Sequence, residues 1–179
     1  MDLARSGPAA AERLPPAGRR YGPLGLRRPG DLRRGPWEDV DWDPFDLVGI
    51  DAYRAAYNAH DFAGQLREIV AGGKPVAVTE FGTCAYRGAG DLGGMAWQPP
   101  AGAVADEREQ VRYLDELLDV FEAEGVDSAF WFTFADYDKP AARDIASYGV
   151  VRLLDGTRWE PKQVFHAMAR RYGRRSTTG

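Results

Sequence analysis

One carboxylate in this sequence draws attention because of its place along the chain. Residues 75–81 form a run of apolar or small side chains in which Glu80 is the one charged residue. On strand geometry Val76, Val78 and Glu80 share one face. A carboxylate at the carboxyl end of a barrel strand lies where barrel enzymes carry out their chemistry. A Glu in this position can equally emerge into the next loop and be solvated, so the pattern by itself leaves both interpretations open.

The run that contains Glu80 is one of three predicted buried strands. Residues 45–53 form a short apolar run after Pro44, and residues 126–134 form another. Such runs are typical of strands that are covered on both faces. Between the first two runs, apolar residues recur at helical spacing over 62–70, and glycines follow at 72 and 73 as a helix stop.

The clearest helix is predicted over about 106–124, with acidic residues in its first turn and Gly125 at its end. Its expected inner stripe consists of Val111, Leu114, Leu118 and Phe121.

The flanking segments are less regular. The glycine-rich stretch over 82–102 predicts no regular structure, and residues 148–154 predict a short extended piece. A turn follows at Asp155, and Pro161 is expected to open a last helix. Apolar strands that alternate with helices indicate an α/β fold with a parallel sheet. Periodicity alone does not separate an open doubly wound sheet from part of a barrel.

Four segments, in the right order, resemble the retaining glycoside hydrolases of clan A, which have (β/α)8 barrels. Residues 74–82 resemble the seventh strand of that fold, and residues 51–53 resemble the end of the sixth. Residues 130–132 resemble the eighth strand, and residues 148–162 resemble the usual run into the final helix. The resemblance implies an α/β fold that is the C-terminal part of a TIM (β/α)8 barrel, strands six to eight, and therefore incomplete.

The resemblance also implies roles for particular residues. Glu80 takes the position of the catalytic nucleophile, Tyr53 that of a hydrogen-bond donor to it, and Trp131 that of an aromatic platform under the sugar. A donor such as Tyr53 would help keep the nucleophile ionised. Asp51, beside Tyr53 in its motif, and Asp136, in the loop after the third strand, are expected to contact substrate. Ordinary packing remains the alternative for both aromatic residues, and a solvated loop is the alternative for Asp136.

The sequence departs from the clan's pattern at the second catalytic group. A retaining glycosidase uses two carboxyl groups about 5–5.5 Å apart. In the clan the acid/base is a Glu that typically follows an Asn on the fourth strand, whereas this chain has one asparagine, Asn58, and no Asn-Glu pair. A complete barrel takes about 250 residues. We therefore expect the glycosidase-like chain to be inactive by itself.

The first part of the chain differs in composition from the rest. Residues 1–36 contain eight arginines and three acidic residues, for a net charge of +5, and six of the twelve prolines. Because the whole chain has a net charge of −4, residues 37–179 have a net charge of −9. We expect this arm to be disordered. Its composition would also fit a reading frame that was mistranslated upstream of the domain. A partial barrel is expected over 37–173, and a disordered tail over 174–179.

Composition excludes several classes of protein. The lone Cys84 permits no intrachain disulfide, and the spacing of acidic and histidine residues predicts no metal or other cofactor. No signal peptide or apolar run of about 20 residues is visible, so a cytoplasmic chain without membrane contact is expected. Nucleic acid is not an expected partner either. The expected partners are a carbohydrate and, through open sheet edges, a missing barrel half or a second copy.

Two functions remain after these exclusions. The first is a glycoside hydrolase-like protein, an O-glycosyl hydrolase once its barrel is completed. The alternative is a non-catalytic carbohydrate-binding or interaction protein of the same fold, similar to bacterial proteins that are labelled abortive infection proteins. A nucleotide-binding open sheet is disfavoured because no glycine-rich fingerprint lies directly between a strand and a helix.

Overall fold

The structure of this chain is a computed structural model that describes residues 41–136, 145–155 and 157–173. The expected arm and the expected tail lie outside the described residues. No helix in the described part of the chain is long and apolar enough to cross a membrane.

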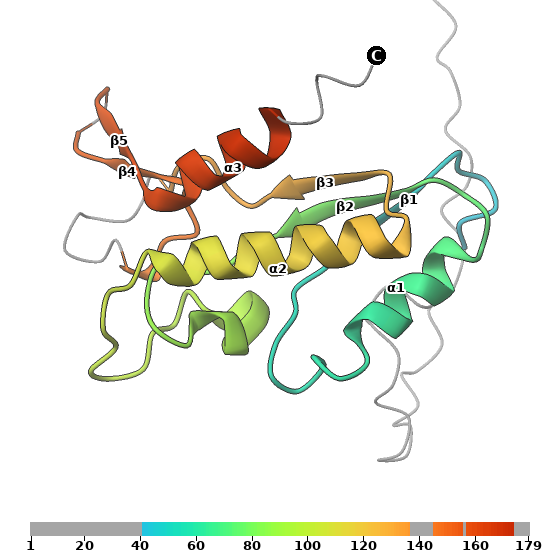
Figure 1. Ribbon diagram of the computed structural model, residues 1–179, viewed down its shortest axis with the longest axis horizontal. Helices are drawn as coiled ribbons and strands as arrows, with labels where there is room; N and C mark the ends of the chain where they lie inside the picture. The colour runs from blue at the N-terminus through green and yellow to red at the C-terminus, as the bar shows by residue number, and fades with distance from the viewer. Residues whose placement is uncertain (1–40, 137–144, 156, 174–179) are drawn as a thin grey trace, which may run out of the picture. The chain divides into compact units, whose positions relative to one another are not determined.

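Three parallel strands form the central sheet (Figure 1). They are β1 (Val48–Asp51), β2 (Val76–Phe81) and β3 (Ser128–Trp131), with β2 in the middle. The three apolar runs therefore form strands as predicted, each shorter than its run. Because parallel strands end at the same edge, the segments after Asp51, Phe81 and Trp131 meet at one end of the sheet.

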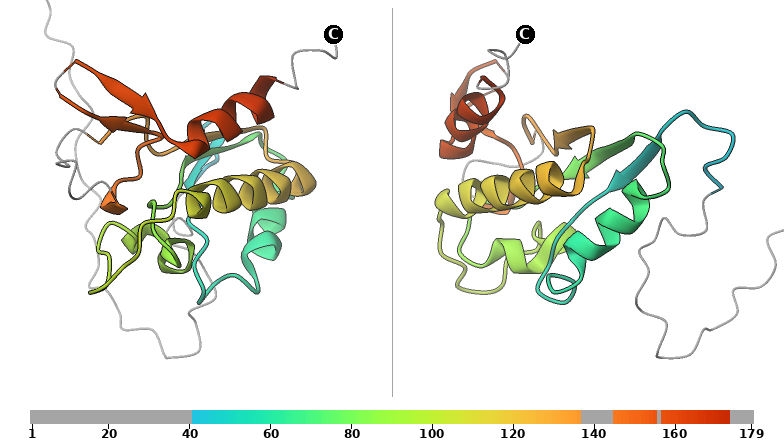
Figure 2. Two further views of the ribbon diagram at one scale, coloured as in Figure 1. Left: turned by 60° about the vertical axis from the view of Figure 1, so that its left-hand side comes forward. Right: turned by 45° about the vertical axis from the view of Figure 1, so that its right-hand side comes forward.

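Helices cover one face of this sheet (Figures 1 and 2). Helix α1 (Phe62–Val70) links β1 to β2, and α2 (Arg108–Glu124) links β2 to β3. The third helix, α3 (Gln163–Gly173), packs along α2. Val76, Val78 and Phe81 of the central strand are fully buried on the covered face. Phe81 meets Phe121 of α2 edge to face, with ring centroids 5.1 Å apart.

An irregularity in β2 decides which way Glu80 points. Val78 pairs with Ala129 while Phe81 pairs with Trp131, so three steps along β2 match two along β3. This bulge adds one residue to the alternation. Phe81, rather than Glu80, therefore continues the buried series of Val76 and Val78. The expectation that Glu80 shares the face of those valines is wrong for this reason.

The opposite face of the sheet is called the uncovered face below. It carries the residues that alternate with the buried ones, namely Gly49, Ala77, Thr79 and Phe130, together with Leu47 just before β1. Its two large apolar residues are exposed, Leu47 to 49% and Phe130 to 59%. The described helices α1 and α2 do not reach them.

Helix α2 shows why its inner stripe was only partly predicted. Leu114 and Phe121 are buried as expected, but Val111 and Leu118 are only partly buried. The other fully buried positions of the helix are Gln110, Tyr113 and Leu117. The buried face of the helix includes Gln110 and Tyr113, and an apolar periodicity cannot identify positions with polar side chains as buried. Gly125, at φ 81°, ends the helix as predicted.

The segments around α2 contain regular structure that the sequence did not predict. A 3-10 helix, η1 (Ala89–Met95), lies within the glycine-rich stretch. The last part of the chain contains an antiparallel hairpin, β4 (Val151–Leu153) and β5 (Trp159–Pro161). Pro161 therefore ends a strand instead of opening α3, because an edge strand tolerates the missing N–H.

Candidate active site

A cavity of about 330 Å³ lies at the carboxyl ends of the parallel strands. Its walls come from the end of β2, the segments after β1 and β3, η1 with the residues that follow it, and the segment before β4. The described residues that line it combine aromatic rings with two carboxylates: Tyr53, Glu80, Gly94, Trp97, Phe132, Asp136 and Tyr148. The structure thus brings Tyr53, Glu80 and Asp136 together, as the sequence predicted.

Glu80 is held by a hydrogen bond from Tyr53. The Tyr53 hydroxyl donates to Oε2 of Glu80 over 3.1 Å. Burial, followed by the negative charge of Glu80, raises the pKa of Tyr53 far above its usual range. The phenol therefore remains a hydrogen-bond donor at neutral pH. A donated hydrogen bond stabilises the ionised form of the carboxylate that accepts it.

The position of Tyr53 is fixed by the loop that follows β1. Asn58 donates from Nδ2 to the Tyr53 carbonyl over 3.2 Å and accepts from the Ala55 amide at 2.7 Å. Gly93 and Gly94 of η1 pack against the other side of Tyr53. A Cβ at Gly93 would come within 3.0 Å of Ala55, and its φ of +56° is one that favours glycine. The glycines thus let η1 approach the tyrosine closely.

Two further rings complete the aromatic wall. Tyr148 stands edge to face against both Tyr53 and Phe132, with centroid distances of 6.2 and 5.8 Å. The ends of β2 and β3 approach each other at Gly82, where a Cβ would lie 2.5 Å from the Phe132 carbonyl oxygen. Any larger residue at position 82 would force a shift at the backbone of Phe132, which lines the cavity.

Two of the expected site residues lie elsewhere. Trp131 does not line the cavity; its ring packs edge to face on Phe81 at 5.4 Å, and its indole N–H donates to the Tyr148 carbonyl over 2.9 Å. Trp131 is thus packed as the sequence alternative allowed, and the next residue, Phe132, faces the cavity. Asp51 is exposed beside the cavity lining, where its Oδ1 accepts a hydrogen bond from Thr79 over 2.8 Å.

Sequence reasoning did not single out Trp97, Phe132 or Tyr148 as cavity residues. Phe132 stood within the strand-eight motif, but the side on which each aromatic residue lies depends on where the strand ends. Tyr148 was assigned to the run into the last helix. Trp97 had a usable signal, since a tryptophan in a glycine-rich loop that follows a candidate catalytic strand is a residue placed for contact.

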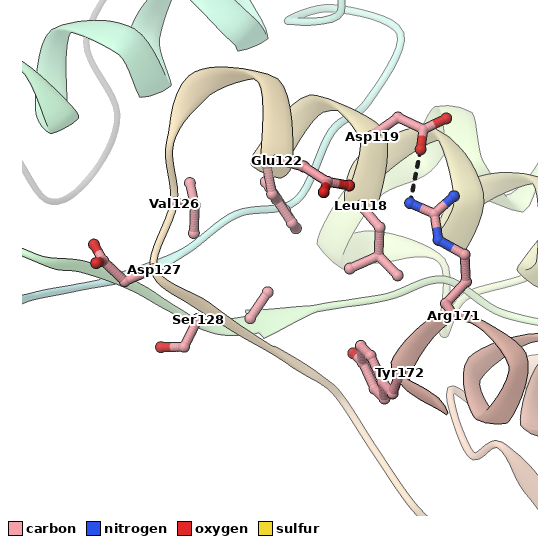
Figure 3. A pocket seen from close by; sticks show the side chains of 10 residues that line it. Leu118, Asp119, Glu122, Val126, Asp127, Ser128, Arg171 and Tyr172 are labelled. Atoms are coloured by element: carbon pink, nitrogen blue, oxygen red, sulfur yellow. Dashed lines mark hydrogen bonds and ion pairs between the residues drawn. The ribbon is translucent and has the colours of Figure 1, made fainter. Parts of the chain in front are cut away.

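A larger cavity, of about 510 Å³, lies away from Glu80 (Figure 3). It is bounded by α2, by residues 126–129 at the start of β3, and by Arg171 and Tyr172 of α3. Arg171 bridges to Asp119 across it at 2.7 Å. This cavity lies at the amino end of the sheet, opposite to the end at which barrel enzymes carry out their chemistry. We therefore place the candidate site at Glu80 despite the greater volume here.

The described residues do not form a metal site. No group of three or more His, Cys, Asp or Glu side chains within them is arranged to hold an ion. The chemistry that the arrangement can perform is that of a carboxylate held by a phenol, within a wall of rings that a sugar could stack on.

Solved structures of glycoside hydrolases resemble this fold. The sequence itself matches no protein-family model and none of the curated proteins. The structure is similar to the GH113 β-mannanase AaManA from Alicyclobacillus acidocaldarius, solved in complex with ManMIm, with a TM-score of 0.55 and 21% identity over 74% of this chain and 40% of that one. It is also similar to a GH113 β-1,4-mannanase complex, with a TM-score of 0.50 and 17% identity over 61% of this chain and 36% of the other.

At such identities the likeness shows the fold. The chain spans about 40% of the length of the mannanases it resembles. Its parallel strands and helices have the α/β fold of part of a TIM barrel.

Proposed function

We propose that this chain carries the nucleophile half of a retaining glycoside hydrolase site, formed by the last three strands of a barrel, with Glu80 as the nucleophile. The observation that supports this most is the hydrogen bond from Tyr53 to Glu80 within a cavity at the carboxyl ends of parallel strands. The hydrogen bond from Tyr53 orients the Glu80 carboxylate, and hydrogen bonds of this kind favour the charged form of a carboxylate. Both are needed for attack on an anomeric carbon.

The proposed substrate is a β-mannoside. The two similar solved structures are mannanases, and aromatic rings beside a carboxylate suit the apolar C–H face of a pyranose. Asp136, in the same cavity, would hydrogen-bond a sugar hydroxyl. Phe132 takes the platform role that the sequence assigned to Trp131, and Asp51 would act at the rim.

The chain should be inactive on ordinary glycosides. Their leaving group needs a proton from a second carboxyl group, and the sequence has no Asn-Glu pair to supply it. A substrate with a good leaving group removes that need. In 2-deoxy-2-fluoro-β-mannosyl fluoride, an oxygen of Glu80 would form a bond to C1 while the C1–F bond breaks and its electron pair leaves with fluoride. No proton has to be donated, and the glycosyl-enzyme ester accumulates.

The test is to incubate the full chain with this fluoride and measure its intact mass and the labelled peptide. We expect one mannosyl adduct on Glu80. Glu80→Gln should give none, and Tyr53→Phe should label more slowly, because its Glu80 lacks the donor. Glu68→Gln, an exposed carboxylate change on α1, is the matched control and should label like the wild type. A wild-type chain that takes no label, or takes it on another residue, would contradict the nucleophile role.

A non-catalytic carbohydrate-binding protein is the second candidate. The missing acid/base residue favours it. The same experiment separates the two, because a binding protein would bind mannosides without forming an adduct.

We also infer that the uncovered face meets further polypeptide. Leu47 and Phe130 are exposed there, and β1 and β3 are edge strands of the described sheet. Unpaired parallel edges of this kind pair readily with other chains. A barrel half supplied by another polypeptide, or a second copy of this chain, would cover them.

A further inference from the structure

Trp97 is an exposed aromatic residue of the cavity to which the proposed reaction assigns no role. Its exposed fraction is 47%, although it lines the same cavity as Glu80. Among the described residues its indole has no ring contact and no hydrogen bond. A large apolar ring left half in water beside a polar cavity loses the burial that such a ring normally gains. A ligand that covered the ring would recover that free energy.

The backbone under Trp97 is fixed, although the ring is exposed. Ala96, the preceding residue, is fully buried, and its carbonyl accepts a 2.7 Å hydrogen bond from the Tyr86 hydroxyl. The Tyr148 hydroxyl donates to the Gly93 carbonyl over 3.2 Å. Burial raises the pKa of Tyr148 well above its usual range, and the nearby backbone N–H groups of Ala96 and Trp97 offset part of that rise. The segment that leads into Trp97 is therefore tied to Tyr86 through Ala96 and to Tyr148 through Gly93.

This combination is that of a preformed binding position. A ring on a fixed backbone loses little conformational entropy when a ligand packs on it. Phe132 and Tyr148 stand edge to face against each other, so their rings already have partners. Trp97 offers a free face from a different element, the loop after η1.

We infer that Trp97 is a sugar-stacking and specificity-determining residue, which binds a pyranose ring of an oligosaccharide whose neighbouring ring lies at Glu80. The inference rests on the proposed carbohydrate site and extends it from one ring to two. Stacking is selective among sugars because a pyranose with a continuous apolar C–H face covers an indole better than one whose polar hydroxyl groups interrupt that face.

The test is a titration of the full chain with mannotriose, followed by isothermal calorimetry and by tryptophan fluorescence. Trp97→Ala should weaken binding roughly tenfold, as expected for the loss of one aromatic contact. Trp97→Phe should retain binding within about threefold and yet lose the sugar-induced change in fluorescence. A merely structural role for Trp97 would not separate these two readouts.

Trp159→Ala is the matched control. Trp159 is exposed to 46%, almost the same fraction as Trp97, but lies on β5 beside Phe134 and Phe165 and outside the cavity lining. Its variant should bind mannotriose like the wild type. Wild-type binding that Trp97→Ala leaves unchanged would overturn this inference and leave the proposed function standing. A wild-type chain that does not bind mannotriose would overturn both.

Discussion

The two faces of the sheet differ in how far their packing is complete. On the covered face Val76, Val78 and Phe81 are fully buried under α1 and α2. On the uncovered face Phe130 is exposed to 59% and Leu47 to 49%. Adjacent residues of one strand thus lie in very different surroundings. Within the described residues, the fold of this chain supplies the sheet and helical layer of part of a barrel wall, and the other face of the sheet carries exposed apolar residues.

The difference bears on the candidate site as well. Glu80 and Tyr53 belong to the end of the sheet, where loops from the helical side reach over the strand ends. Their hydrogen bond depends on Asn58 and η1, which are both within the described chain. The part of the candidate site around Glu80 and Tyr53 is therefore held by the described residues, whereas the uncovered face is not packed.

The largest expected effect is on stability, and it comes from removing a phenylalanine ring from each face of the sheet in turn. Phe81→Ala should lower the free energy of unfolding by about 3–5 kcal/mol, because it leaves a cavity beneath α2. Phe130→Ala should change it by roughly 0.5 kcal/mol or less, since the ring is already in water. Urea denaturation followed by circular dichroism measures both. Equal losses would show that the two faces are packed alike and would break the comparison.

A second, smaller effect concerns association rather than folding. Burying one Phe ring is worth about 1.5–3 kcal/mol. If the uncovered face mediates self-association, Phe130→Asp should therefore weaken it roughly tenfold or more. Sedimentation velocity over a range of protein concentrations measures the dissociation constant of this self-association. Tyr57→Asp, at a residue exposed to 80% in the loop after β1, is the control and should associate like the wild type. A wild-type chain that remains monomeric, or an unchanged variant, would count against a second copy on this face.

The smallest effect is expected on the outer side of the helical layer. Arg171 of α3 bridges to Asp119 of α2 at 2.7 Å and lies 3.7 Å from Asp115. Asp119 is largely exposed, so Arg171→Gln should cost only about 0.5 kcal/mol. The difference from wild type should vanish in about 1 M salt, where the screening length is about 3 Å. If the loss of unfolding free energy persisted at high salt, it would come from packing of the aliphatic part of the Arg171 side chain between α2 and α3 instead of from the ion pair.

Much of the fold follows from local sequence. The apolar runs that became β1, β2 and β3 could be recognised because strands buried on one face and partly covered on the other are apolar at almost every position. Helix α2 ends at Gly125 as expected because the left-handed turn there favours glycine. The hairpin of β4 and β5 could not be predicted, since Pro161 gives the same signal at a strand end as at a helix start.

The sequence identified the carboxylate of the candidate site, but it did not identify most of the aromatic residues that line the cavity. Glu80 was recognisable because a single carboxylate interrupts an apolar run. The choice between Trp131 and Phe132 depended on where β3 stops, and η1 could not be inferred from a stretch with many glycines. Trp97 and Tyr148 lie 51 residues apart in the sequence, and only the tertiary fold brings them into one cavity.

The bulge in β2 has a consequence for comparing this chain with others. A strand without the bulge reaches the same buried position one residue sooner. An alignment that counts residues evenly from Val76 would therefore pair Glu80 with a position that points into the helical layer, and Phe81 with one that points at the cavity. A gap beside Thr79 restores the correspondence. For the same reason, deleting Thr79 would remove the bulge and leave the acid and the phenylalanine on the sides that they occupy now.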